Sequence, residues 1–178
     1  IKHDPEVING RLLHNRVGYT MEDQLPLVLG LRGDPWLGHL EEELLEKIPK
    51  EGMSRIELFD GYPKGKENAH VQRSLKSALS NLERQLVIGK KYIELANRKR
   101  SLAVFHRIQD RVKPMKFDEA VKTLIERIGP VRLHTLRFFV SRPVEELAET
   151  LRDLENAGKI ARVVALQPDP TDYYSSHE

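Results

Sequence analysis

The sequence predicts an α+β fold, mainly α-helical with small β-hairpins, in which one order of elements occurs twice. Three successive segments carry apolar residues at helical spacing, and two short runs rich in β-branched and aromatic residues follow them. The same succession returns after a linker at 112–114. The chain has 178 residues, which is long enough for one large or two small domains. We therefore expect two domains of one design, preceded by a lead-in.

The lead-in is expected over residues 1–33. Residues 1–19 are predicted to be polar and extended, and a short helix follows, in which Leu25 and Leu29 belong to the apolar face. Gly33 ends this helix.

The first domain is expected over residues 34–113. Asp34-Pro35 predicts a helix start, because a capping carboxylate precedes a proline at the first helical position. Ser54 and Glu57 have the spacing of a capping box, which begins a short second helix. The longest amphipathic helix and the two strands of a hairpin are then predicted over 68–85, 86–95 and 101–108.

The second domain is expected over residues 114–178 and repeats this order with a helix, a short helix, a long helix and two strands. These elements are predicted over 117–128, 132–140, 141–157, 160–166 and 172–175. Helix, short helix, long helix and hairpin is the order of a helix-turn-helix followed by a wing. The sequence thus predicts tandem winged helix-turn-helix domains.

Charge is distributed unevenly along the chain. Residues 61–113 hold 13 Lys and Arg against 4 Asp and Glu, a local charge of +9, whereas the remaining residues hold 16 against 23 and carry −7. A basic segment in a chain with a net charge of only +2 indicates a surface for a polyanion. The alternative is a solvated basic face that binds nothing.

We expect double-stranded DNA as the partner, bound by the solvent face of helix 68–85 and by the hairpin with its tip at 96–100. A helix fits the major groove of B-DNA, and an arginine fork matches the O6 and N7 atoms of guanine. The predicted DNA-binding residues are His70, Arg73, Lys76, Ser77, Ser80, Arg84, Lys90, Lys91, Arg98, Lys99 and Arg100.

The solvent face of the long helix in the second domain is expected to carry the opposite charge. Carboxylates outnumber cations on its solvent face, so it would repel phosphate and suggests a docking site for a protein partner. The carboxylates are Glu145, Glu146, Glu149, Asp153 and Glu155, against Arg142 and Arg152.

No pattern in the sequence indicates an active site. The absence of cysteine excludes disulfides, thiolate zinc sites and a cysteine nucleophile. The 7 histidines are scattered, and neither a phosphate-binding glycine loop nor a nucleophile elbow is present. We therefore expect no catalytic residue, no metal and no cofactor.

The chain holds no apolar run of the roughly 18 residues that a membrane helix needs. It begins with a polar stretch rather than a signal peptide. We expect a cytoplasmic protein, associated with the nucleoid if the source is prokaryotic. Because the chain starts at Ile1 rather than Met, we also expect residues upstream.

The run Leu40–Pro114 resembles the middle of the YcaQ-like winged-helix proteins, which include DNA glycosylases that repair interstrand crosslinks. The segment Leu124–Lys159 resembles the next winged helix of that family. The similar features of the first run are the helices 41–48, 55–59 and 73–82, the loop with Gly61 and Lys64, and the strand that ends Val104-Phe105-His106-Arg107-Ile108. The resemblance implies tandem winged helices that bind DNA.

The family's glycosylases also have an upstream catalytic Gln-x-Gln or Gln-x-Asp motif and a downstream β-rich domain. We expect this chain to lack both, so no catalytic residue is transferred to it. Its glutamines, none of which is expected to supply the motif, are Gln24, Gln72, Gln85, Gln109 and Gln167.

Three functions follow from these observations. The first is a DNA-binding protein, such as a transcriptional regulator, and a homodimer is compatible with it because many DNA readers pair across half-sites. The second is a non-catalytic portion of a DNA-repair glycosylase. The third is a protein-interaction module in a nucleic-acid-processing complex.

Overall fold

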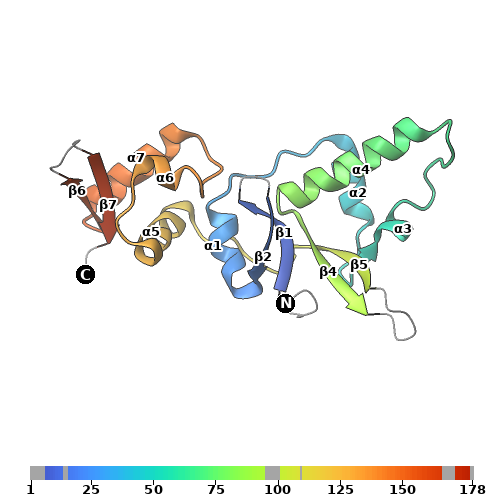
Figure 1. Cartoon of the computed structure of the whole chain (residues 1–178), viewed down its shortest axis with the longest axis horizontal. Coiled ribbons are helices and arrows are strands. Elements are labelled where there is room, and N and C mark those ends of the chain that lie inside the picture. The colour runs from blue at the N-terminus through green and yellow to red at the C-terminus, as the bar shows by residue number, and fades with distance from the viewer. Residues whose placement is uncertain (1–6, 14–15, 95–100, 109, 166–170, 177–178) are drawn as a thin grey trace. The chain divides into compact units, whose positions relative to one another are not determined.

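The computed structural model describes residues 7–13, 16–94, 101–108, 110–165 and 171–176 (Figure 1). The chain is an α+β protein, as predicted, in which helices alternate with small antiparallel sheets. It divides into two compact units. Unit 1 comprises residues 1–24 and 35–113, and unit 2 comprises residues 25–34 and 114–178.

The predicted lead-in 1–33 is therefore divided between the two units. Helix α1 (Leu25–Gly30) belongs to unit 2, where Leu27 joins the hydrophobic core. The amide of Met115 donates to the carbonyl of Pro26 at 2.9 Å. A Cβ at Gly30 would lie 2.6 Å from the carbonyl oxygen of Met115, so this close approach needs a glycine.

Unit 1 is built on one antiparallel sheet with three helices packed beside it. Its elements are β1 (Val7–Leu13), β2 (Arg16–Met21), a 3-10 turn η1 (Glu22–Gln24), α2 (His39–Lys47), β3 (Met53–Ser54), α3 (Arg55–Leu58), α4 (Ala69–Arg84), β4 (Ile88–Glu94) and β5 (Ser101–Arg107). The strand order is β2-β1-β4-β5-β3. Its core joins Leu44, Leu58, Leu75, Leu82 and Phe105 from the helices and the sheet.

The predicted start of the first helix is wrong. Helix α2 begins at His39, not at Asp34-Pro35, and its cap residue Gly38 is extended. The side-chain amide of Gln85 donates to the carbonyl of Trp36 at 2.6 Å, and this bond links the segment before α2 to the end of α4. The predicted capping box is confirmed, since Ser54 and Glu57 exchange both hydrogen bonds at the start of α3.

Unit 2 packs four helices against a two-stranded hairpin. Besides α1, it contains α5 (Phe117–Ile128), α6 (Leu133–Leu136), α7 (Val144–Asn156), β6 (Ile160–Ala165) and β7 (Thr171–Ser176). Strands β6 and β7 are antiparallel, and Val131 forms a further bridge with Tyr174 of β7. Helix α6 is shorter than the predicted 132–140, because the turns that follow it end the regular helix.

The buried leucines of the long helix and the turn that follows it recur in both units with the same spacing. Leucines that are buried on α4 recur on α7, 72 residues further along the chain, as Leu75 and Leu147, Leu79 and Leu151, and Leu82 and Leu154. Both helices end in the same turn, in which Val87 N donates to Leu82 O at 3.0 Å and Lys159 N donates to Leu154 O at 2.8 Å.

The residue before each of these donors has a left-handed backbone. Leu86 has a φ of +55° and Gly158 a φ of +65°, as in the common glycine turn at a helix C-terminus. A leucine is strained in this conformation, but the Leu86 side chain is fully buried, and that burial offsets the strain. Strands β4 and β6 then begin at Ile88 and Ile160, again 72 residues apart.

Candidate nucleic-acid interface

Helix α4 presents one apolar face to the core of unit 1 and one polar face to solvent. Residues repeat about every 100° around a helix, so the leucines at 75, 79 and 82 fall on the inner face, where they are buried. Of the predicted DNA-binding residues on this helix, Ser80 is half-buried. The exposed ones are His70, Arg73, Lys76, Ser77 and Arg84.

The exposed face of α4 is positive because the helix has a single carboxylate and that carboxylate is paired. Glu83 lies 2.6 Å from the ammonium of Lys90, and only 18% of its side chain is exposed. The cations that α4 itself carries are Arg73, Lys76 and Arg84. An anionic ligand that approaches this face therefore meets cations and hydroxyls rather than a free carboxylate of the helix.

Lys90 and Lys91 of β4 are among the predicted DNA-binding residues, and both are engaged within unit 1. Lys90 pairs with Glu83 and lies 5.3 Å from the ring centroid of Phe105. Lys91 lies 3.6 Å from a carboxylate oxygen of Glu22. Both lysine side chains are about one-fifth exposed. Either one would have to leave an ion pair to meet DNA, and their role in binding stays a prediction.

The hairpin itself forms as predicted, with β4 and β5 paired from Ile88–Arg107 to Glu94–Ser101. The basic tip, with Arg98, Lys99 and Arg100, lies outside the residues that the structure describes.

Helix α7 has the opposite charge on the corresponding face. Glu145, Glu149 and Asp153 are exposed there, beside a single exposed cation, Arg152. Positions 145, 149 and 153 correspond by the 72-residue repeat to Arg73, Ser77 and Asn81 of α4. Two helices with matching inner faces thus differ in the sign of their outer faces.

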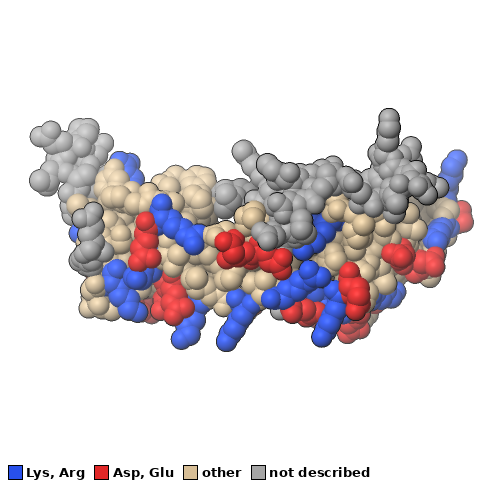
Figure 2. Space-filling view, turned by 90° about the horizontal axis from the view of Figure 1, so that it is seen from below, with Lys and Arg blue, Asp and Glu red and all other residues tan. Residues whose placement is uncertain are grey.

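Basic and acidic residues are mixed on the face that Figure 2 shows. Figure 2 shows one face on which Lys and Arg lie among Asp and Glu, so its described part offers no surface of a single sign.

His106 is a buried polar residue that the sequence did not single out. It packs against Gly52, whose φ is +91°; a Cβ there would lie 2.4 Å from the histidine Cε1. Desolvation by burial, and next the charge of Arg111, lower the pKa of His106. The Nδ1 atom lies 3.2 Å from the Arg111 guanidinium, and Nε2 has no partner among the described residues. This arrangement favours the neutral form of His106 and points to a structural role.

The described residues show neither a metal-binding cluster nor a helix suited to a membrane. They contain no group of three or more His, Cys, Asp or Glu that could hold a metal ion. None of the helices that the structure describes has the length and apolar character required to span a membrane.

One expectation about the catalytic motif needs correction. Gln167-Pro168-Asp169 does have Gln-x-Asp spacing. It comes after β6 in the sequence, however, instead of upstream of the winged helices, and it lies outside the described residues. The only glutamine before residue 34 is Gln24, which is followed by Leu-Pro and begins neither form of the motif.

Comparison with known proteins identifies a similar fold but no family. No family model and no curated protein matches the chain. Among solved structures, the chain is similar to Streptomyces sahachiroi DNA glycosylase AlkZ, with a TM-score of 0.65 and 16% sequence identity. The match covers 96% of this chain and 52% of the glycosylase chain, so this chain spans about half the length of that glycosylase. This likeness supports a distant structural relationship to a DNA glycosylase.

Proposed function

We propose that the chain is a DNA-binding protein made of two winged helices, in which unit 1 binds duplex DNA. The element order of unit 1 from α2 to β5 supports this assignment, because β3 lies between the first two helices and pairs with the second strand of the hairpin. Unit 2 has the same order from α5 to β7, with Val131 in the place of β3 and paired to β7. The repeated segment at the ends of α4 and α7 strengthens the parallel.

The observation that carries the proposal is the positive outer face of α4. In a winged helix the second helix of the helix-turn-helix enters the major groove, and α4 holds that place in unit 1. Arg73 and Lys76 are exposed for contact with phosphates or base edges, and the small Ser77 lets the helix approach closely. The basic hairpin tip, Arg98–Arg100, is proposed to add phosphate or minor-groove contacts.

The proposal assigns unequal roles to the two units. The exposed carboxylates of α7 disfavour entry of that helix into a groove lined by phosphates. We therefore assign duplex binding to unit 1. Control of transcription and handling of damaged DNA both require such binding.

Fluorescence anisotropy with a labelled duplex tests this assignment. We expect salt-sensitive binding that Arg73→Ala weakens, because it removes an exposed cation from α4. Arg152→Ala is the matched control, since it removes an exposed arginine from the corresponding helix of unit 2, and it should leave binding nearly unchanged. Absence of binding at low salt, or equal losses from the two variants, would refute the proposal.

A second candidate function is that of the DNA-holding part of a base-excision enzyme. The fold similarity to a DNA glycosylase over nearly the whole chain favours it. Incubation of the full-length natural protein with a duplex that contains 7-methylguanine, followed by alkaline cleavage at abasic sites, distinguishes the two. Cleavage that depends on the chain supports excision, whereas binding without abasic sites supports a chain that binds DNA without cutting the glycosidic bond.

A further inference from the structure

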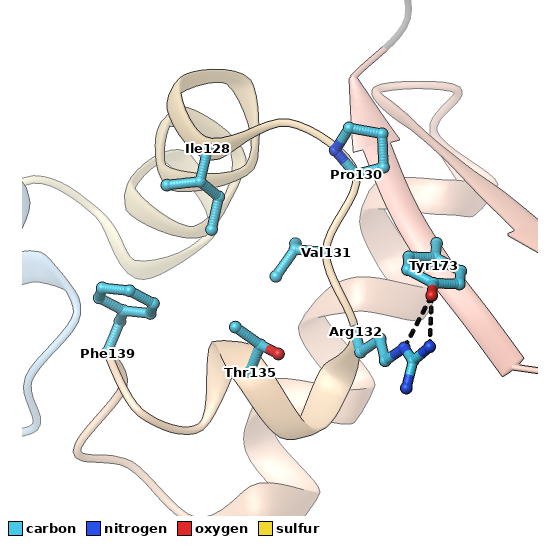
Figure 3. A pocket seen from close by; sticks show the side chains of 7 residues that line it. All are labelled: Ile128, Pro130, Val131, Arg132, Thr135, Phe139 and Tyr173. Atoms are coloured by element: carbon cyan, nitrogen blue, oxygen red, sulfur yellow. Dashed lines mark hydrogen bonds between the residues drawn. The ribbon is translucent and has the colours of Figure 1, made fainter.

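Unit 2 has an open pocket beside α6, with a volume of about 300 Å³, that contains none of the proposed DNA-binding residues (Figure 3). Ile128 at the end of α5, Pro130 and Val131 in the following turn, and Phe139 after α6 supply apolar walls. Val131 is buried, and 43% of Ile128 is exposed. The volume is at the lower end for ligand pockets and suits one apolar side chain rather than a large molecule.

The polar groups of this pocket lie on one side of it. The Arg132 guanidinium lies 4.9 Å from the ring centroid of Tyr173, and its Nε donates to the Tyr173 hydroxyl at 2.9 Å. Its Nη2 donates to the same oxygen (Figure 3). A guanidinium has five N–H donors, so an external carboxylate can still bind it. The remaining polar group is the hydroxyl of the exposed Thr135.

The segment 127–137, which supplies five of the seven residues that line the pocket, is basic and apolar. From Arg127 to Arg137 the sequence holds three arginines and no Asp or Glu. Phe138, next to the pocket residue Phe139, is 48% exposed. Exposed apolar side chains inside a rim of charged ones are typical of protein-interaction sites.

We propose that this pocket binds a partner polypeptide that inserts one side chain of leucine or phenylalanine size and places an adjacent carboxylate on Arg132. Charge complementarity identifies the partner as acidic. The inference does not depend on DNA binding by unit 1, because it uses a different surface. It also differs from docking on the acidic face of α7, which would select a basic partner.

The pocket is less suited to a nucleobase. Arg132 already covers the Tyr173 ring, which reduces the aromatic surface on which a base could stack. Recognition of a base edge uses several hydrogen-bonding groups. The lining offers mainly aliphatic and aromatic carbon beside one hydroxyl and one guanidinium.

NMR with the ¹⁵N-labelled full chain tests the proposal. The probe is a short synthetic peptide with a central leucine followed by two glutamates. Matched peptides replace the leucine by alanine or the glutamates by lysines, and a short oligothymidylate serves as the nucleic-acid probe. We expect the leucine–glutamate peptide to shift the amide signals of Val131, Arg132 and Thr135, and both altered peptides to bind at least about tenfold more weakly.

Three variants sharpen the test. Arg132→Gln should weaken the peptide at least about tenfold, because hydrogen bonds to charged groups contribute about 1.5–3 kcal/mol. Thr135→Trp should abolish binding by filling the pocket, and a dispersed spectrum will establish that the variant is folded. Arg152→Gln, which removes an exposed charge from α7, should change affinity less than about twofold.

Equal binding of the leucine and alanine peptides would overturn the proposal, as would equal losses from Arg132→Gln and Arg152→Gln. Shifts at these three amides with oligothymidylate but not with the peptide would also overturn it, and would assign the pocket to single-stranded nucleic acid.

Discussion

Removing Arg73 and Lys76 from α4 is expected to weaken duplex binding and to flatten its dependence on salt. Both side chains are exposed, whereas the one carboxylate of the helix, Glu83, is held by Lys90. Each phosphate that a cation neutralises contributes about 0.9 to the slope of log K against log salt. If each side chain neutralises one phosphate, Arg73→Ala with Lys76→Ala lowers the magnitude of the slope by about 1.8.

The slope fixes the size of the loss at each salt concentration. The counterion contribution to affinity vanishes near ~1 M salt, so a slope difference of about 1.8 corresponds to about a 200-fold loss at ~50 mM and about a 20-fold loss at ~200 mM. A mutation that disturbed only base contacts would instead weaken binding by a factor that varies little with salt. The salt series therefore separates phosphate contacts from base contacts on α4.

Fluorescence anisotropy over such a salt series measures this effect. The matched control is Arg152→Ala with Lys159→Ala, which removes the same formal charge from exposed positions of unit 2. We expect the control to leave the slope nearly unchanged. An unchanged slope in the α4 variant would refute phosphate contacts by Arg73 and Lys76. The same decrease in the control would show that net charge rather than the face of α4 governs binding.

Three further predictions concern the stability and protonation of unit 1. Gly52→Ala is expected to lower the free energy of unfolding by about 2–5 kcal/mol, because its φ of +91° is strained for alanine and the new Cβ would lie 2.4 Å from His106 Cε1. Gly61→Ala, with a φ of +85° and no described atom within 4 Å of its Cβ, should cost only about 1–2 kcal/mol; similar urea midpoints for the two variants would contradict this reasoning. Burial lowers the pKa of His106, so its contribution to stability is complete above about pH 6.5, its unfolded value, and is lost as the pH falls from there through the folded pKa. An NMR titration should therefore give a midpoint below ~6.5 for His106, and a midpoint above it would count against a neutral buried ring. Ser54→Ala should cost about 0.5–2 kcal/mol in urea unfolding through loss of the α3 cap, whereas Ser54→Thr, which keeps a capping hydroxyl, should cost less.

Local patterns in the sequence were sufficient to predict most helices and both β-hairpins that follow the long helices. The inner face of α4 follows from residue spacing alone, and the Ser54–Glu57 cap forms between residues three positions apart. The solvent face of α4 could be predicted for the same reason, because a helix fixes which positions share a side.

Features that depend on distant residues could not be predicted. The contact of Gln85 with Trp36 spans 49 positions and accompanies an extended segment where a helix start was expected. The pairing of Lys91 with Glu22 depends on how the N-terminal hairpin joins the sheet. Arg132 and Tyr173 are 41 positions apart, and no periodicity indicates that they share a pocket. The ion pairs that hold the β4 lysines are likewise contacts that a count of charges along the sequence does not reveal.

The 72-residue repeat separates the positions that determine the fold from those that determine binding. The buried leucines of α4 recur on α7, and the turn after each helix is closed by the same hydrogen bonds. The outer positions do not recur, since Arg73 corresponds to Glu145 and Ser77 to Glu149. Exposed substitutions of this kind alter stability little, but they reverse the potential that a phosphate meets at the helix. A repeated fold can thus carry two surfaces of opposite sign, which supports the proposed assignment of duplex DNA to α4 and leaves the basic pocket beside α6 for an acidic partner.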